Sequence, residues 1–503
     1  MKNFLIKNRY LIFLLFIVVL AVFLRFWRLS EYMTFLGDEG RDALALKRMI
    51  VDHKFRLIGP VTSIGNMYLG PIYYYLALPA MAVSRLSPVG PAAFVAFLGV
   101  VTVGLVFWWG KEWVGEKGAL MAAFLYALSP IVIIYSRSSW NPNVMPFFAL
   151  VTMFGLWRVW QKRQFWWLPI IGVTLSFALQ SHYLGLLLIP TVGIFWILAF
   201  KESLKQKTLK KFLLMSFLCC LLFVVLTIVP LVWFDLRHNF INFNAFKIFF
   251  TDRQATVNFK IYKAIPNLFS LTTQIFTRLV AGKDEFWGKW FALIFIIPTV
   301  FTLLLRRNRM EKAGLILIFT WFLVGLLGLG NYKQHIYDHY FGFFFPVPFL
   351  LTGWVWAKIW DGRLIGKIVA VILLCFLVFL AIKESPLRYP PNRQLEKTKL
   401  IAQFVLDKTN GKPFNLALIA ERNYDEAYAF FMEVWGKPPL RIDPQKAKET
   451  IAEQLLVICE QLPCQPVGHP KAEIAMFGWT KIAEKWQIEG VEVYKLIPYE
   501  KRD

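Results

Sequence analysis

Residues 71–87, PIYYYLALPAMAVSRLS, decide how this chain is threaded through a membrane. The run is apolar, yet it opens with three tyrosines and contains Pro79 and Arg85. A spanning helix needs about 20 apolar residues, and tyrosine and arginine favour the boundary between lipid and water. We therefore expect residues 71–87 to form a helix that lies in the outer interface or enters the bilayer only partway.

The composition around this run is that of a polytopic membrane protein. Of the 503 residues, 57% are hydrophobic and 17% are charged, whereas soluble domains are roughly 45–50% apolar with about 25% charge. This excludes a single soluble globule, a disordered chain and a coiled coil. A first run at 11–27 lacks a cleavage site and is expected to be an uncleaved span. Further apolar runs lie near 90–110, 118–136, 143–160, 166–181, 183–200, 212–234, 289–305, 313–330, 341–357 and 366–383. The pattern predicts about 11 transmembrane helices plus interfacial helices.

The charges predict an orientation. The net charge is +24, and all of it lies in residues 1–383, because residues 384–503 hold 17 acidic and 17 basic side chains. If residues 71–87 do not span, the basic clusters between the later runs all fall on one side, and short cytoplasmic loops carry the Lys/Arg excess. We therefore expect a multi-pass plasma-membrane protein with a cytoplasmic N-terminus and an extracytoplasmic C-terminus. Basic residues placed between apolar runs exclude a nucleic-acid partner.

Two modules follow from this pattern. Residues 1–383 form a transmembrane module with long outer loops at about 29–89 and 235–288. Residues 384–503 open with the proline-rich linker SPLRYPPNR and form a small α/β exoplasmic domain. Its predicted elements are helices near 394–409 and 424–434 and strands at 414–419, 455–458 and 491–494. An oxidising location permits a disulfide between Cys459 and Cys464, but their close spacing leaves the pairing open.

The sequence FLGDEGRDALALKRMI (35–50) is the leading candidate for chemistry. Three of the 15 acidic residues of the transmembrane module, Asp38, Glu39 and Asp42, fall within five positions at the start of a helical pattern. One interpretation is a capped helix, since acidic residues favour a helix N-terminus. The other is a carboxylate that takes a proton from an acceptor hydroxyl, or a pair, Asp38 and Glu39, that holds one divalent cation such as Mg²⁺ or Mn²⁺. The two interpretations are compatible, because a capped helix start also holds a catalytic carboxylate in a fixed position.

This layout resembles the GT-C glycosyltransferases, and within them the protein mannosyltransferase and aminoarabinose transferase branch. The resemblance rests on a first span followed by DEGRDALAL (38–46), with a D-E-x-R-like signature at Asp38, Glu39 and Arg41, and on GPIYYYLAL (70–78). It covers about residues 1–380. It implies an all-α GT-C fold and transfer of a hexose or pentose from a polyprenyl-phosphate donor to a glycan, lipid or protein acceptor on the exoplasmic face. It also implies that Asp38 is the catalytic base, with Glu39 beside it.

One turn departs from the family pattern. Many relatives carry a second acidic site after the third span, whereas SRSSWNPNVMPFF (136–148) has Asn141 and Asn143 there. Asparagine binds a hydroxyl but is a weak metal ligand, so a two-site metal arrangement is not expected. Arg137 is a candidate for the donor phosphate, together with Arg41, because a guanidinium replaces a cation on phosphate. The alternative for Arg137 is a structural, snorkelling arginine.

Two further outer turns supply candidate binding residues. FALQSHYLGLLLIP (177–190) places His182 and Tyr183 between two spans, where polar side chains are costly unless they line a cavity. In GLGNYKQHIYDHYFGFFFPVP (328–348), Lys333 is a candidate for the donor phosphate, and His339 and Tyr340 are candidates for substrate binding. A structural histidine and a solvated lysine are the plain alternatives.

Other function classes remain as alternatives. A transporter or lipid flippase needs charged residues buried in mid-span or paired broken helices, and the central spans here are almost free of charge. A second alternative is a non-catalytic scaffold whose tail recruits partners, which a transfer assay distinguishes from the proposed enzyme. A third is a transferase with a larger oligosaccharide donor, which is distinguished by the size of the donor.

Overall fold

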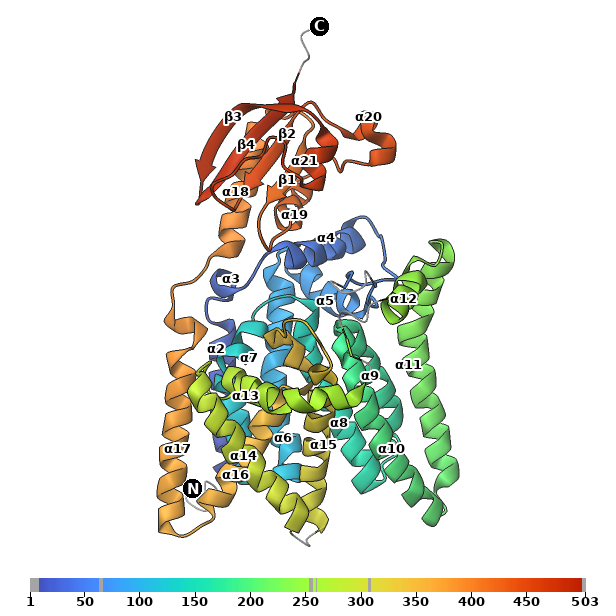
Figure 1. Ribbon diagram of the computed structural model, residues 1–503, viewed down its shortest axis with the longest axis vertical. Coiled ribbons are helices and arrows are strands. Elements are labelled where there is room, and N and C mark those ends of the chain that lie inside the picture. Colours follow the sequence, from blue (N-terminus) through green and yellow to red (C-terminus); the bar gives the residue numbers. More distant parts are fainter. Residues whose placement is uncertain (1–8, 63–66, 253–256, 259, 306–308, 500–503) are drawn as a thin grey trace.

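The computed structural model describes residues 9–62, 67–252, 257–258, 260–305 and 309–499. A bundle of long apolar helices carries a small α/β domain at one end (Figure 1). The bundle helices are α2 (Arg9–Phe26), α6 (Val89–Leu128), α8 (Met145–Lys162), α9 (Trp167–Ser181), α10 (Leu188–Lys205), α11 (Leu209–Arg237), α14 (Glu285–Leu305), α15 (Arg309–Gly330), α16 (Pro346–Trp360) and α17 (Leu364–Lys383). We call the end of the bundle that carries the α/β domain the domain face.

Seven of the described helical segments are long and apolar enough to cross a membrane, and a bent pair ending in α16 is an eighth. The 40-residue α6 contains a break at Gly115, whose φ of 78° is left-handed, so its two halves correspond to the two runs predicted at 90–110 and 118–136. Counting those halves separately and adding the shorter apolar helices α2 and α9 accounts for the predicted number of about 11 segments.

A close contact between two glycines brings α6 against α16 within the bundle. α6 packs along α16, and a Cβ atom placed on Gly353 would lie 2.1 Å from the Gly118 carbonyl oxygen. Small residues allow membrane helices to approach at backbone distance, where van der Waals contact drives association. The outward side chains remain apolar, as at Phe217, which is 62% exposed. Such a surface is typical of contact with lipid.

Shorter elements cover the domain face and connect the helices. They are α3 (Leu29–Tyr32), α4 (Gly37–Val51), α5 (Ile72–Val83), α7 (Pro130–Tyr135), α12 (Ile241–Asp252), α13 (Leu268–Leu279) and the 3-10 helices η1 (Asn141–Val144), η2 (Tyr183–Leu187), η3 (Ile261–Asn267) and η4 (Asp338–Phe344). α5 has 12 residues, about 18 Å of helix, against about 30 Å of hydrocarbon core. It is therefore too short to span, as the sequence predicts.

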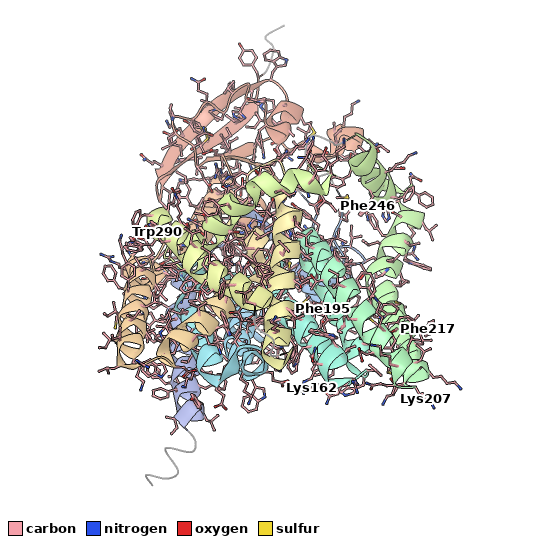
Figure 2. The ribbon with its side chains drawn as sticks, turned by 60° about the horizontal axis from the view of Figure 1, so that its bottom comes forward. Lys162, Phe195, Lys207, Phe217, Phe246 and Trp290 are labelled. Atoms are coloured by element: carbon pink, nitrogen blue, oxygen red, sulfur yellow. A yellow bond between two sulfur atoms is a disulfide. The ribbon has the colours of Figure 1, made fainter. Side chains whose placement is uncertain are left out.

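The basic turns lie at the end of the bundle away from the α/β domain. The connections α10–α11 and α16–α17 are both at that end (Figure 1). Figure 2 labels Lys162 and Lys207 there, and Phe195 is buried within the bundle. The segregation of charge that the sequence predicts is therefore present in the fold.

The C-terminal domain is a four-stranded mixed sheet with helices against it. Its strands β1 (Asn415–Ile419), β2 (Leu455–Cys459), β3 (Thr480–Ile488) and β4 (Val491–Pro498) are ordered β1-β2-β4-β3, with β1 parallel to β2 and the other pairs antiparallel. The helices are α18 (Gln394–Lys408), α19 (Glu426–Val434), α20 (Ala447–Thr450), α21 (Ala472–Phe477) and the 3-10 turns η5 (Pro386–Arg388) and η6 (Pro444–Lys446). β1 and β2 are fully buried, as their apolar runs predict. Cys459 and Cys464 form a disulfide.

Candidate active site

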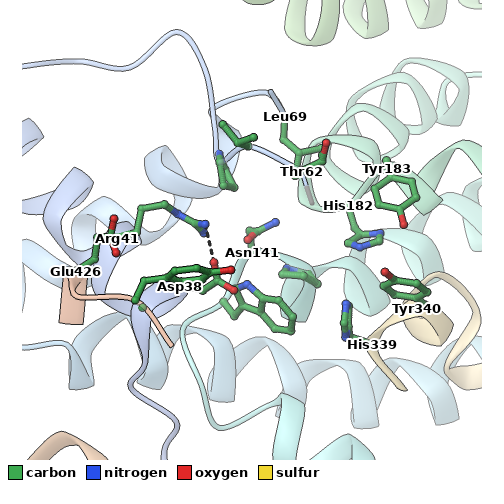
Figure 3. Close-up of a pocket in the computed structure, with 16 residues that line it drawn as sticks. Asp38, Arg41, Thr62, Leu69, Asn141, His182, Tyr183, His339, Tyr340 and Glu426 are labelled. Carbon is green, nitrogen blue, oxygen red and sulfur yellow. Dashed lines mark hydrogen bonds and ion pairs between the residues drawn. The ribbon is translucent and has the colours of Figure 1, made fainter. Parts of the chain in front are cut away.

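A cavity of about 410 Å³ lies on the domain face between α4, the ends of the bundle helices and the C-terminal domain (Figure 3). We call it the main pocket. It is lined by Gly37, Asp38, Arg41, Pro60, Val61, Thr62, Leu69, Trp140, Asn141, Pro142, His182, Tyr183, His339, Tyr340, Tyr424 and Glu426. Seven of the ten predicted site residues are among them: Asp38, Arg41, Asn141, His182, Tyr183, His339 and Tyr340.

Asp38 stands in the first turn of α4 and faces this pocket. The Arg41 guanidinium donates from Nη1 to Asp38 Oδ1 at 2.6 Å, and the described residues give Oδ2 no hydrogen-bond donor. The backbone N–H of Gly37 donates to Asn423 Oδ1 of the C-terminal domain at 2.7 Å. The first turn of a helix has unsatisfied N–H groups, so this bond fixes the turn that carries Asp38.

Glu39 and Asp42 are buried and support α4 from within. Glu39 is 5% exposed, and its Oε2 accepts the Leu36 N–H at 3.0 Å, the bond of an N-terminal capping residue. Asp42 Oδ1 accepts from Arg41 and, at 3.1 Å, from the Tyr74 hydroxyl. Burial raises the pKa of Glu39 to about 7 and that of Asp42 to about 6, because a desolvated carboxylate is costly. Glu39, predicted as catalytic, is thus bonded to the backbone before α4 and is not among the residues that line the main pocket.

The far wall of the main pocket is built from the ends of bundle helices and is aromatic. Asn141 donates from Nδ2 to the Ser181 carbonyl at 2.6 Å, which ties η1 to the end of α9. His182 stacks on Tyr183 with 4.3 Å between ring centroids, and its Nδ1 accepts the Leu184 N–H. Burial lowers the pKa of His182 well below its usual value, so its ring is neutral. Flat rings and neutral polar atoms of this kind suit a sugar.

The second half of that wall comes from η4. The rings of His339 and Tyr340 are 4.6 Å apart, and Tyr340 lies 5.3 Å from His182. Arg278 of α13 donates from Nε to Asp338 Oδ1 at 2.6 Å, which anchors the start of η4. The two turns that the sequence singles out separately therefore meet in one wall.

Arg137 and Lys333 are not among the lining residues. Arg137 is 2% exposed and donates to the carbonyls of Leu24 at 2.7 Å and Trp27 at 2.6 Å. The last carbonyls of a helix lack partners within it, so Arg137 caps the end of α2. This placement corresponds to the structural alternative. Lys333 is exposed in the loop after α15. The contacts of Arg137 give no support to a role on the donor phosphate.

In the part of the chain that the structure describes, Asp38 and Glu39 are not arranged as a divalent-metal site. Asp38 and Glu39 both border a smaller cavity of about 270 Å³ on the other side of the α4 start. However, Asp38 is paired with Arg41, and Glu39 is bonded to a backbone N–H. Mg²⁺ and Mn²⁺ prefer octahedral oxygen ligands. In the described part of the chain, no group of three or more His, Cys, Asp or Glu side chains is placed to hold a metal.

The C-terminal domain supplies pocket residues that the sequence reading did not single out. Tyr424 and Glu426 line the main pocket together with Trp140 and Thr62. The Glu426 Oε2 atom is buried without a hydrogen-bond partner, and burial raises the pKa of this carboxyl group. Glu426 follows Asp38 by almost 400 positions, and nothing in the local sequence signals that the two share a cavity.

Comparisons with known proteins place the fold. Residues 70–233 match the family model of dolichyl-phosphate-mannose-protein mannosyltransferases. None of the curated proteins matches the sequence of this chain.

Two solved structures are similar over most of the chain. ArnT from Cupriavidus metallidurans bound to undecaprenyl phosphate has a TM-score of 0.61 at 12% identity, covering 97% of this chain and 98% of ArnT. The oligosaccharyltransferase AglB from Archaeoglobus fulgidus, in complex with an inhibitory peptide and a dolichol-phosphate, has a TM-score of 0.55 at 12% identity, covering 90% of this chain and 70% of AglB. At this identity the likeness shows a shared fold.

Proposed function

We propose that this chain, which has the fold of the GT-C membrane glycosyltransferases, is a member of that superfamily and moves a sugar from a polyprenyl-phosphate donor to an acceptor hydroxyl. Asp38 serves as the general base. The observation that carries the proposal is the position of Asp38, on a fixed helix start, in a cavity whose opposite wall is made by the ends of bundle helices. ArnT binds undecaprenyl phosphate and AglB binds a dolichol-phosphate on the same fold, which supports the donor class.

The reaction uses the two ends of the main pocket. The donor enters from the lipid with its tail between helices and its sugar against the rings of His182 and Tyr340. Asp38 takes the proton of the acceptor hydroxyl, whose oxygen attacks the anomeric carbon from the face opposite the leaving group. The bond from that carbon to the phosphate oxygen breaks, and the carrier phosphate leaves. The sugar is transferred with inversion.

Arg41 is the group that meets the departing phosphate. Among the described residues that line the main pocket, it is the single lysine or arginine. Its Nη1 holds Asp38, and a guanidinium has five donors, so it can bind an oxyanion while it orients the base. Positive charge placed where negative charge develops lowers the barrier of such a step.

The reaction takes place on the exoplasmic face. The basic turns lie at the opposite end of the bundle from the main pocket, and Lys/Arg-rich short loops are cytoplasmic. The N-terminus is then cytoplasmic, and the C-terminal domain and the pocket are extracytoplasmic in the plasma membrane. The sugar is a hexose or pentose, and the acceptor is a glycan, lipid or protein.

The test is transfer by purified Asp38→Asn protein with a panel of polyprenyl-phosphate sugars, measured as release of carrier phosphate. We expect a loss of about 100-fold or more, the usual contribution of a general base. Asp52→Asn is the matched control, because Asp52 caps the far end of the same helix and pairs with Lys47 outside the pocket. Normal transfer by Asp38→Asn protein would refute the assignment of the base, and failure of the wild type with every donor would refute the donor class.

A further inference from the structure

A second cavity of about 450 Å³ adjoins the main pocket and is rich in arginine. We call it the arginine cavity. It shares Arg41 and Glu426 with the main pocket, and its wall includes Arg48 from α4, Arg56 from the loop before α5 and Arg441 from the C-terminal domain. Four guanidinium groups from three segments therefore surround one space beside Asp38.

Three of these arginines are already oriented by carboxylates that do not line the cavity. Arg41 bonds Asp42, Arg48 bonds Glu433 at 2.7 Å, and Arg441 bonds Asp425 at 2.5 Å. Each acid engages part of a fork of five donors, and the arginines still line the cavity. Among the described lining residues, Glu426 is the single acidic side chain. The surface of the cavity is thus strongly cationic.

Arg56 has no such partner. Its Nε is buried without a hydrogen-bond acceptor, and its guanidinium makes no ion pair with any described residue. A buried, unsatisfied charged donor carries a desolvation penalty that is recovered when an anion arrives. Arg56 is therefore poised for a ligand oxyanion.

We propose that the arginine cavity binds a carboxylate or phosphate group of the acceptor, and that the acceptor is an acidic glycan. The inference rests on the proposed function and names its acceptor class. The anionic group would hold the glycan so that a neighbouring hydroxyl lies at Asp38, because Arg41 borders both cavities.

The position of the cavity favours the acceptor over the donor. Its charged residues come from α4, the loop before α5 and the C-terminal domain, all outside the helices that could span the membrane. The departing donor phosphate is assigned to Arg41, which borders both cavities, whereas Arg48, Arg56 and Arg441 line the arginine cavity and not the main pocket. An acceptor approaches from the C-terminal domain, where α4 lies against α19 (Figure 1).

The lining favours a sugar over a peptide. The cavity of about 450 Å³ has Tyr68 and Tyr74 in its wall, and ligand pockets combine such rings with a few placed charges. Extended peptides are usually bound along an open strand edge or a long groove. The test must therefore distinguish binding of an acidic sugar from binding of an acidic peptide.

The test measures binding to the purified full-length protein in nanodiscs. The probes are trigalacturonate, its uncharged methyl ester, a phosphorylated trisaccharide, triglutamate and undecaprenyl phosphate. We expect the two acidic sugars to bind at least tenfold more tightly than the methyl ester, with affinity that falls as salt rises. The proposal is overturned if neither acidic sugar binds more tightly than the methyl ester, or if triglutamate binds best.

Variants locate the binding. Arg56→Gln and Arg441→Gln should each weaken the binding of an acidic sugar by about tenfold or more, since both remove a charge-assisted contact. Neither should change the affinity for undecaprenyl phosphate. Arg388→Gln is the control, because Arg388 is exposed and lies between α17 and α18, away from the arginine cavity. Parallel weakening of undecaprenyl-phosphate binding by Arg56→Gln would show that the cavity serves the donor.

The binding test, read together with the carrier-phosphate release assay on the same protein, separates the inference from the function on which it rests. If acidic sugars bind but no donor releases its carrier phosphate, the inference about the arginine cavity holds and the proposed transferase activity is refuted. If undecaprenyl phosphate binds and the sugar is transferred to neutral glycans alone, the proposed function holds and the acidic acceptor is refuted.

Discussion

Glu39 makes the stability of the α4 start depend on pH. Its folded pKa is raised by burial from 4.5 to about 7. A carboxyl group that holds its proton more tightly in the folded state stabilises that state at low pH, and the contribution is lost as pH rises from the unfolded value to the folded one. We therefore expect the thermal stability of the wild type to fall between about pH 4.5 and 7, by at most about 3 kcal/mol from this group.

Glu39→Gln checks this dependence by the midpoint of thermal unfolding across that range. Glutamine is uncharged at every pH and keeps an acceptor for the Leu36 N–H. The decline should become shallower, although Asp42 still contributes in the same direction. Glu453→Gln, at an exposed position, should leave the curve unchanged. An identical curve for the wild type and Glu39→Gln would mean that Glu39 is already ionised at low pH.

Asn423 is a positioning residue for Asp38. Its Oδ1 accepts the Gly37 N–H at 2.7 Å, and its Nδ2 donates to Glu460 at 2.8 Å. Asn423→Ala should cost about 1–2 kcal/mol of stability, as for the loss of a helix cap. It should also lower the turnover number more than it changes the donor KM, since the base is displaced while the donor wall is intact.

Turnover and the donor KM, measured with the same polyprenyl-phosphate sugar, decide this prediction. Gln465→Ala, an exposed change in the same domain, is the control. A stability loss without any change in turnover would show that the bond to Gly37 is structural alone.

At the residue scale, the sequence predicts which segments meet better than which side chains line the pocket. Asp38 is identifiable because carboxylates are rare in the transmembrane module and this one starts a helix. Arg137 lies in the expected turn, but the direction of its side chain depends on the unpaired carbonyls of α2, which no local pattern reveals. Glu426 depends on contact between distant segments and has no signal of its own.

At the scale of elements, α4 is held between α5 and α19. A Cβ atom at Gly40 would lie 2.3 Å from the Ala427 Cα, so the two helices touch at backbone distance. Gly40→Ala should therefore push α19 away and cost about 1–3 kcal/mol, as overpacking does. Transfer should fall with it, because α19 begins at Glu426 in the pocket wall.

Gly104→Ala is the matched control for that substitution, because nothing lies within 4 Å of its added carbon in α6. It should be neutral or slightly stabilising, since alanine favours a helix. The midpoint of thermal unfolding in detergent distinguishes the two variants. Equal unfolding midpoints for the two variants would show that α4 and α19 accommodate the added methyl group at Gly40 without loss of stability.

Elements with an apolar run are predicted well, and those without one are not. β1, β2 and β4 follow buried runs, and the two predicted helices of the C-terminal domain, α18 and α19, fall within a few residues of their expected bounds. The short helices α20 and α21 are not predicted from the sequence. β3 has the sequence TKIAEKWQI and exposes most of its residues at the edge of the sheet, so it has no apolar run to reveal it. The 40-residue α6 shows the reverse case, because a kink at Gly115 joins two runs that the sequence separates.

At the scale of the whole molecule, the two ends of the bundle should lie on opposite sides of the membrane. Trp479 is 90% exposed on the C-terminal domain, and Lys207 is exposed at the opposite end of the bundle. In a variant without the free cysteines Cys219, Cys220 and Cys375, Trp479→Cys should react with a membrane-impermeant maleimide in intact cells. Lys207→Cys should react only after the membrane is opened. The opposite pattern would place the pocket in the cytosol and contradict the exoplasmic reaction.

The seam between α4 and α19 also bears on how such chains can be recombined. Glu433 bridges to Lys47 and Arg48 across this seam, and Tyr424 packs against Gly37. A C-terminal domain grafted from another protein of the same fold would bring its own pocket residues. It would pack against α4 only if the residues that contact it across this seam were exchanged as well. Chimaeras that exchange the tail and the first loop as one cassette should therefore be the productive route to altered acceptor choice.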